Sequence, residues 1–84
     1  MHTLVNPKSV RFDESTMWVE LSDGRTLGMP LAWYPRLLGA SPDLLNAVEL
    51  SPSGLHWDAL DEDLSVAGML AGLGAHNDRR IAAA

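Results

Sequence analysis

Apolar and polar residues alternate with a period of two along residues 8–29. The apolar members of this pattern are Val10, Phe12, Met17, Val19, Leu21, Leu27 and Met29. Such alternation is typical of β-strands that bury one face. Turn-forming residues separate the three apolar groups, and Asp23-Gly24 readily adopts the positive φ of a tight hairpin turn. The pattern therefore predicts an antiparallel meander of three strands, with Gly24 in its second turn.

Short helical signals follow the meander. Pro30 lacks a backbone donor and ends the third strand, and Pro35 predicts a single helical turn that begins near it. Ser41-Pro42-Asp43 supplies a cap, a proline at the first helical position and an acid in the first turn, which together predict a helix start. The Ser51–Gly54 segment should end this helix and turn the chain.

Two further elements are expected after residue 54. Leu55 and Trp57 flank His56 in alternation, which predicts a short strand returning to the sheet. The spacing of Val66, Met69, Leu70 and Leu73 predicts a helix from residue 64 or 65 to about residue 73, with Asp61 or Asp63 as its cap.

These elements together predict an α+β fold. We expect a three-stranded antiparallel meander with a returning strand and two short helices packed on it. The length of 84 residues allows one small domain. We place this domain at residues 1–74 and a flexible tail at residues 75–84.

Charge divides the chain into two parts. Lysines and arginines balance the acids over residues 1–36, whereas residues 37–78 contain no Lys or Arg and sum to −7. The acids of this second part are Asp43, Glu49, Asp58, Asp61, Glu62, Asp63 and Asp78. An acidic surface attracts a basic partner and speeds its docking, although a solvated face that maintains solubility has the same composition.

Composition excludes several classes of function. The chain has no cysteine, which removes disulfides, thiolate zinc sites and cysteine nucleophiles. No apolar run is long enough for a membrane span, and the first residues lack a signal-peptide pattern, so we expect a cytoplasmic protein. The net charge of −5 argues against direct nucleic-acid binding, because nucleic-acid binders usually carry the opposite charge.

No motif predicts an active site, a metal site or a bound cofactor. The three histidines lack the spacing that places two metal ligands on one face, and the acids of residues 58–63 lack the spacing of a calcium loop. His56 could act as a general base near these acids, or it could be a half-exposed strand residue. We expect no catalytic activity.

Three segments carry a resemblance to a known family. They are Asp23-Gly24-Arg25-x-Leu27-x-x-Pro30-Leu31, Trp33-Tyr34-Pro35-Arg36-Leu37, and Gly54-Leu55-His56-Trp57-x-x-Leu60-Asp61-Glu62-Asp63-Leu64-Ser65-Val66. Together they resemble the bacterial family known as domain of unknown function 2442. The resemblance implies a small α+β module whose gene lies beside a small companion gene, in an arrangement like that of toxin–antitoxin pairs. Some longer members add a helix-turn-helix segment, which we do not expect in this chain.

The motif residues also have a structural interpretation. Gly24 serves a turn, and Pro30 and Pro35 set the direction of the chain. Trp33, Leu37 and Trp57 are expected to fill the core.

Three functions stay open on the sequence alone. The first is a non-catalytic binding module, an antitoxin-like or inhibitory subunit that pairs with a small basic protein such as a toxin encoded nearby. Its contact residues would be Asp58, Asp61, Glu62 and Asp63. The second is a nucleic-acid-associated transcriptional regulator that acts as a homodimer, and the third is a hydrolase that uses His56. The terminal Ile81-Ala82-Ala83-Ala84 resembles a degradation signal of bacterial proteases, or it is an inert end.

Overall fold

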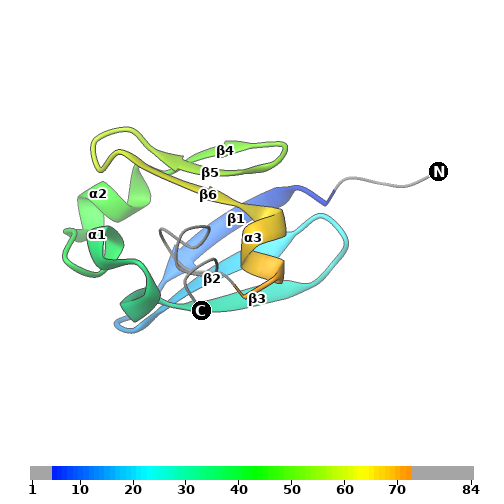
Figure 1. Ribbon diagram of the computed structural model, residues 1–84, viewed down its shortest axis with the longest axis horizontal. Coiled ribbons are helices and arrows are strands. Elements are labelled where there is room, and N and C mark those ends of the chain that lie inside the picture. The colour runs from blue at the N-terminus through cyan, green and yellow to red at the C-terminus, as the bar shows by residue number, and fades with distance from the viewer. Residues whose placement is uncertain (1–4, 73–84) are drawn as a thin grey trace, which may run out of the picture.

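The computed structural model describes residues 5–72 of the chain. It contains two three-stranded antiparallel sheets and a few short helices, which confirms the α+β fold. Figure 1 shows the two sheets as separate layers, with the helices between them and at one end. The prediction of a flexible tail at residues 75–84, and of a degradation signal within it, lies outside the described residues.

The first sheet is the predicted meander. Its strands are β1 (Pro7–Phe12), β2 (Thr16–Leu21) and β3 (Thr26–Pro30), in the order β1-β2-β3. The register places Val10 opposite Val19 and Val19 opposite Leu27, so the alternating apolar residues share one face. Gly24 adopts a φ of +95° in the β2–β3 turn, as predicted for an Asp-Gly turn.

Three short helical elements connect the two sheets. They are the 3₁₀ turn η1 (Leu31–Trp33), α1 (Pro35–Leu38) and α2 (Pro42–Asn46). Pro35 is the first residue of α1, and the Ser41 hydroxyl caps α2 by accepting the Leu44 N–H at 3.3 Å. Both predicted helix starts are confirmed.

The second half of the chain corrects one prediction of topology. The strand at Leu55–Trp57 does not return to the first sheet. It belongs to β5 (Gly54–Trp57), the central strand of a second sheet with β4 (Glu49–Ser51) and β6 (Glu62–Ser65). The Ser51–Gly54 segment makes a tight hairpin, which pairs β5 with the residues directly before it.

The last helix is shorter than predicted. Residues 62–65 form a strand in which Glu62 and Leu64 are buried while Asp63 and Ser65 are exposed. α3 therefore begins only at Val66 and ends at Leu70. Ser65 caps it by accepting the Gly68 N–H at 2.9 Å, so neither Asp61 nor Asp63 is the cap.

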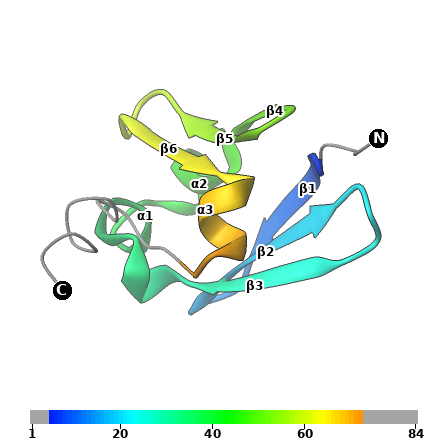
Figure 2. The same ribbon diagram turned by 45° about the vertical axis from the view of Figure 1, so that its right-hand side comes forward.

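The core lies between the two sheets. In Figure 2, α3 lies between them, beside β6 and β3. The buried apolar residues are Met17, Val19, Leu21, Met29, Leu31, Tyr34, Leu37, Leu45, Leu55, Trp57, Leu64, Val66 and Met69. β5 and β6 contribute alternate residues to this core, as expected for a sheet that has one face in solvent.

The core position predicted for Trp33 is wrong. Trp57 and Leu37 are buried as predicted, but Trp33 is 44% exposed. η1 has only three residues, and its buried side chain is that of Leu31. A single short turn cannot direct both Leu31 and Trp33 into the core, because neighbouring helical side chains diverge.

No helix within residues 5–72 is both long and apolar enough to cross a bilayer.

Candidate functional site: the acidic face of the second sheet

The solvent face of the second sheet carries a row of three polar side chains. Glu49 of β4 lies opposite His56 of β5, and His56 lies opposite Asp63 of β6. Leu55 and Trp57 turn inward on either side of His56, so His56 and its two cross-strand neighbours face outward. We call Glu49, His56, Asp58, Asp61 and Asp63 the acidic face.

His56 is held between two carboxylates. Its Nδ1 lies 2.6 Å from Oδ1 of Asp63, and its Nε2 lies 3.5 Å from Oδ1 of Asp58. The hydrogen bond with Asp63 is the main cause that raises the pKa of His56, and the contact with Asp58 adds to it. Imidazolium is therefore favoured at this position.

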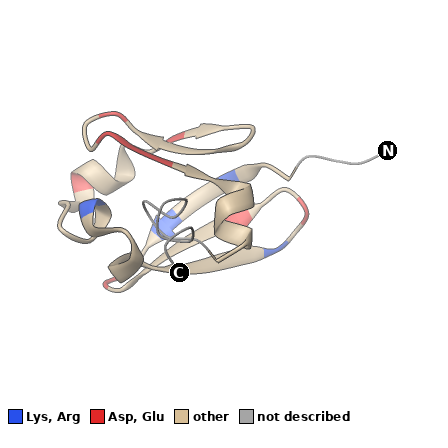
Figure 3. Cartoon of the chain, in the orientation of Figure 1, with Lys and Arg blue, Asp and Glu red and all other residues tan. Residues whose placement is uncertain are grey.

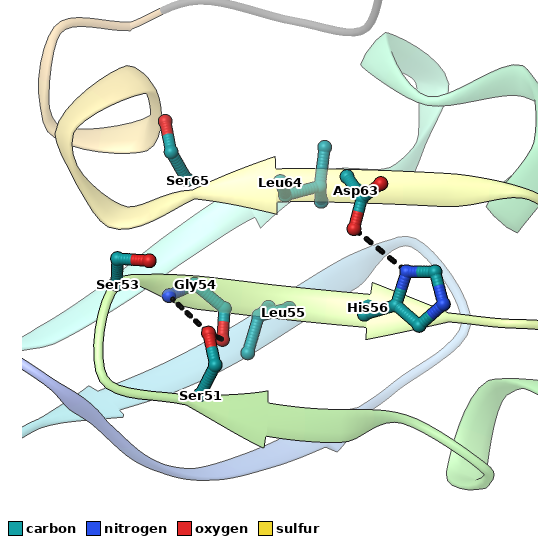
Figure 4. Close-up of a pocket in the computed structure, with 8 residues that line it drawn as sticks. All are labelled: Ser51, Ser53, Gly54, Leu55, His56, Asp63, Leu64 and Ser65. Atoms are coloured by element: carbon teal, nitrogen blue, oxygen red, sulfur yellow. Dashed lines mark hydrogen bonds and ion pairs between the residues drawn. The ribbon is translucent and has the colours of Figure 1, made fainter.

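A shallow hollow of about 170 Å³ lies beside this row. Figure 4 shows Ser51, Ser53 and Ser65 around Gly54 at one end of the hollow, with His56 and Asp63 at the other. A Cβ atom at residue 54 would collide with the carbonyl oxygen of Leu64, so only glycine permits this close approach of β5 and β6.

The serines of the hollow do not form a nucleophilic site with His56. The Ser51 hydroxyl accepts the Gly54 N–H at 3.1 Å, and the Ser65 hydroxyl caps α3. Both ring nitrogens of His56 face carboxylates. A serine hydrolase would instead need a hydroxyl at one of these nitrogens. Within residues 5–72 the structure also brings together no group of three or more histidines and acids suited to a metal ion.

Three of the four predicted partner-binding acids lie on the surface. The side chains of Asp58, Asp61 and Asp63 are 91%, 97% and 79% exposed. Asp61 occupies the β5–β6 turn with a φ of +52°, a conformation that Asp tolerates better than most residues.

Glu62 is the exception, and its predicted place in a binding surface is wrong. It is 6% exposed, because its position in β6 turns it toward the core. Its Oε1 lies 3.9 Å from Nη1 of Arg36 in α1. Tyr34 is also near: burial raises the pKa of Tyr34 to about 12, and the charge of Glu62 contributes to this rise.

Glu49 belongs to the acidic face, although sequence reasoning did not select it. The signal was present in the hairpin, because a turn at residues 51–54 places residue 49 opposite residue 56. Figure 3 shows acidic segments and no basic one on the second sheet and its β5–β6 turn, whereas the first sheet carries both acidic and basic segments.

Comparison with known proteins places the chain in a family. The sequence model of the family described as "Protein of unknown function (DUF2442)" matches residues 7–75. The chain belongs to the DUF2442 family. No curated protein sequence matches this DUF2442 chain.

Two solved structures share the DUF2442 fold. A crystal structure of a protein of unknown function from Rhodospirillum rubrum is 37% identical, with a TM-score of 0.72 over 84% of this chain and 90% of that chain. A solution NMR structure of an uncharacterised protein from Chromobacterium violaceum is 30% identical, with a TM-score of 0.68. The latter match covers 80% of this chain and 65% of that one.

Proposed function

We propose that this DUF2442 domain is a non-catalytic protein-binding module, an antitoxin-like or inhibitory subunit that pairs with a small basic protein through the acidic face. The observation that carries the proposal is the cross-strand row of Glu49, His56 and Asp63 on an exposed sheet surface. The row gathers charges that are spread along the sequence into one contiguous site.

The surroundings of this face strengthen its negative potential. Residues 37–78 contain no Lys or Arg, so within the described part of this stretch only the imidazolium of His56 offsets the four carboxylates of the acidic face. Among the described residues, the basic side chain that contacts the edge of this region is that of Arg36, whose Nη1 lies 3.9 Å from an oxygen of Asp61 and of Glu62. A patch of net negative charge attracts a basic protein and raises its association rate.

The carboxylates retain capacity for a basic side chain. His56 contacts the Oδ1 atoms of Asp63 and Asp58, and within the described residues the structure gives their Oδ2 atoms no hydrogen bond. An arginine of the partner can bind a carboxylate through two parallel N–H groups. Because His56 separates the carboxylates, two basic side chains can bind on either side of the ring.

The test is co-expression with the product of the neighbouring gene, followed by affinity measurement. We expect Glu49→Lys with Asp58→Lys to weaken binding at least about tenfold and to flatten its salt dependence. Both positions are exposed, so the double variant should melt near the wild-type temperature.

A matched control changes the same net charge elsewhere. Glu14→Lys with Glu20→Lys alters two exposed acids of the first sheet, away from the acidic face. This control should bind within about twofold of wild type. An equal loss of affinity in both double variants would show that net charge alone, and not the acidic face, determines binding. Unchanged affinity of the Glu49→Lys with Asp58→Lys variant would refute the role of the acidic face.

A further inference from the structure

The outer edge of β3 is an open, uncharged strand edge. β3 ends the order β1-β2-β3, and no described residue pairs with its far side. Its sequence from Thr26 to Pro30 contains no charged residue. Edge strands of soluble proteins are usually protected by charges, prolines, bulges or covering segments. Pro30 stands at the end of β3, and the rest of the strand carries no charge or proline, which indicates a pairing surface.

Two hydrogen bonds show which backbone groups of β3 face outward. Leu21 N–H donates to the Arg25 carbonyl at 2.8 Å, and Leu31 N–H donates to the Ser15 carbonyl at 2.9 Å. Hydrogen-bonded pairs alternate along an antiparallel ladder, so Leu27 and Met29 bond to β2. The N–H and C=O groups of Thr26 and Gly28 therefore point away from the sheet, together with the Pro30 carbonyl.

This set of outward groups is self-complementary. A two-fold axis at Gly28 would let the two Gly28 residues exchange a pair of N–H···O=C bonds. On either side, Thr26 N–H would donate to the Pro30 carbonyl of the second copy. Pro30 has no N–H, and in this register it is needed only as an acceptor. The strand thus offers four hydrogen bonds to its own copy.

Electrostatics also favours a second copy at this sheet. Residues 1–36, which include all of the first sheet, carry no net charge, whereas the following stretch to residue 78 carries −7. Two copies that meet through their second sheets would place like charges together. Two copies that meet through β3 make contact through the part of each chain that carries no net charge.

The neighbouring tryptophan accounts for the glycine at residue 28. Trp18 lies opposite Gly28, and a Cβ at residue 28 would come 2.6 Å from Cζ3 of the indole. The indole is held by a hydrogen bond of 2.9 Å from Nε1 to Asp13 Oδ2, and Arg11 lies over the ring at 5.8 Å. Gly28 therefore carries no side chain that obstructs an approaching strand.

We infer that two copies of this chain associate through antiparallel pairing of β3 with β3, which joins their first sheets into one six-stranded sheet. The pairing is independent of the acidic face, so a dimer leaves that face of each copy open. A five-residue edge makes a small interface, and small interfaces are weak. We expect a dimer that forms between about 10 µM and about 1 mM.

Hydrogen exchange on the wild-type protein tests this inference. The Thr26 and Gly28 amides should exchange about two- to sixfold more slowly at ~1 mM than at ~20 µM, because the monomer fraction falls by that factor over this range. The opposite edge supplies the control, because the bond from Asp13 N–H to the Thr16 carbonyl directs the Val10 and Phe12 amides outward on β1. Those two amides should exchange at the same rate at both concentrations.

A pair of variants tests the same contact by sedimentation equilibrium. Thr26→Pro removes an outward N–H without touching the β2–β3 ladder, and should weaken association at least about tenfold. Thr26→Val retains the N–H and should associate within about twofold of wild type. A monomer at ~1 mM, or unchanged exchange of the Thr26 and Gly28 amides, would overturn the inference even if Thr26→Pro failed to fold.

Discussion

The indole Nε1 of Trp57 donates a hydrogen bond of 3.0 Å to the carbonyl oxygen of Leu45. This bond joins the central strand of the second sheet to α2, and both partners are buried. It satisfies a carbonyl near the end of a short helix, where intrahelical donors are absent. The ring fills the core while its one polar atom is paired.

Trp57→Ala should lower the free energy of unfolding by about 3–5 kcal/mol, because it leaves a large cavity and an unpaired carbonyl. Chemical denaturation monitored by circular dichroism measures this loss. Trp57→Phe retains most of the apolar contact and should lose less. Trp33→Ala is the control, since Trp33 is 44% exposed whereas Trp57 is buried. A loss equal to that of Trp57→Ala would contradict the assignment of the two side chains.

Glu62→Lys should destabilise the domain by at least about 2 kcal/mol. The substitution would bury a positive charge beside Arg36, whose Nη1 lies 3.9 Å from the present carboxylate. Asp58→Lys has the same charge change at an exposed position and should alter stability by less than about 0.5 kcal/mol. Thermal melts of the two variants at one pH compare them, and similar melting temperatures would place Glu62 on the surface.

Protonation of His56 should stabilise the fold. Asp63 is the main cause that raises the pKa of His56 above its ordinary value of 6.5. The protonated ring therefore adds to the free energy of unfolding. This addition is fully present below pH 6.5 and is lost as the pH rises through the higher pKa of His56 in the folded state. An NMR titration of the ring should show the pKa fall in Asp63→Asn, and fall less in Asp58→Asn. An unaltered pKa of His56 in the Asp63→Asn variant would exclude the contact between His56 and Asp63.

Two glycine substitutions should have opposite effects. Gly24→Ala forces alanine into a φ of +95° and should cost about 1–2 kcal/mol, although no atom obstructs the added Cβ. Gly39→Ala occurs at a φ of −90°, and its Cβ would meet only the Pro35 carbonyl at 3.9 Å. It should stabilise the domain by about 0.4–1 kcal/mol. The denaturant midpoint of each variant gives the sign of its stability change. A lower midpoint for Gly39→Ala would contradict this account.

The first sheet was predictable because its information is local. Alternation along residues 8–29 and an Asp-Gly turn determine the strands and their pairing. The second sheet was not predicted as such, because all three residues of β4 are exposed and show no alternation. β4 is a strand because it pairs with β5. The residue pattern within 49–51 carries no information about that pairing.

The candidate site was predictable only in part, for a similar reason. Asp58, Asp61 and Asp63 were selected by charge alone, and the structure places them on the surface. Glu62 has the same charge, yet its surroundings depend on Arg36, a residue distant in sequence. The acids before an apolar helical pattern also resemble a capping segment, which concealed the strand at residues 62–65.

Arg36 has a consequence for how the molecule assembles. Its Nη1 donates to the carbonyls of Leu60 and Asp61, residues of the turn between the last two strands. α1 has only four residues, too few to be stable in isolation, so its placement depends on a hairpin that is synthesised later. The segment that links the sheets therefore becomes ordered only once both are present, and the two halves of the chain should unfold in a single cooperative transition.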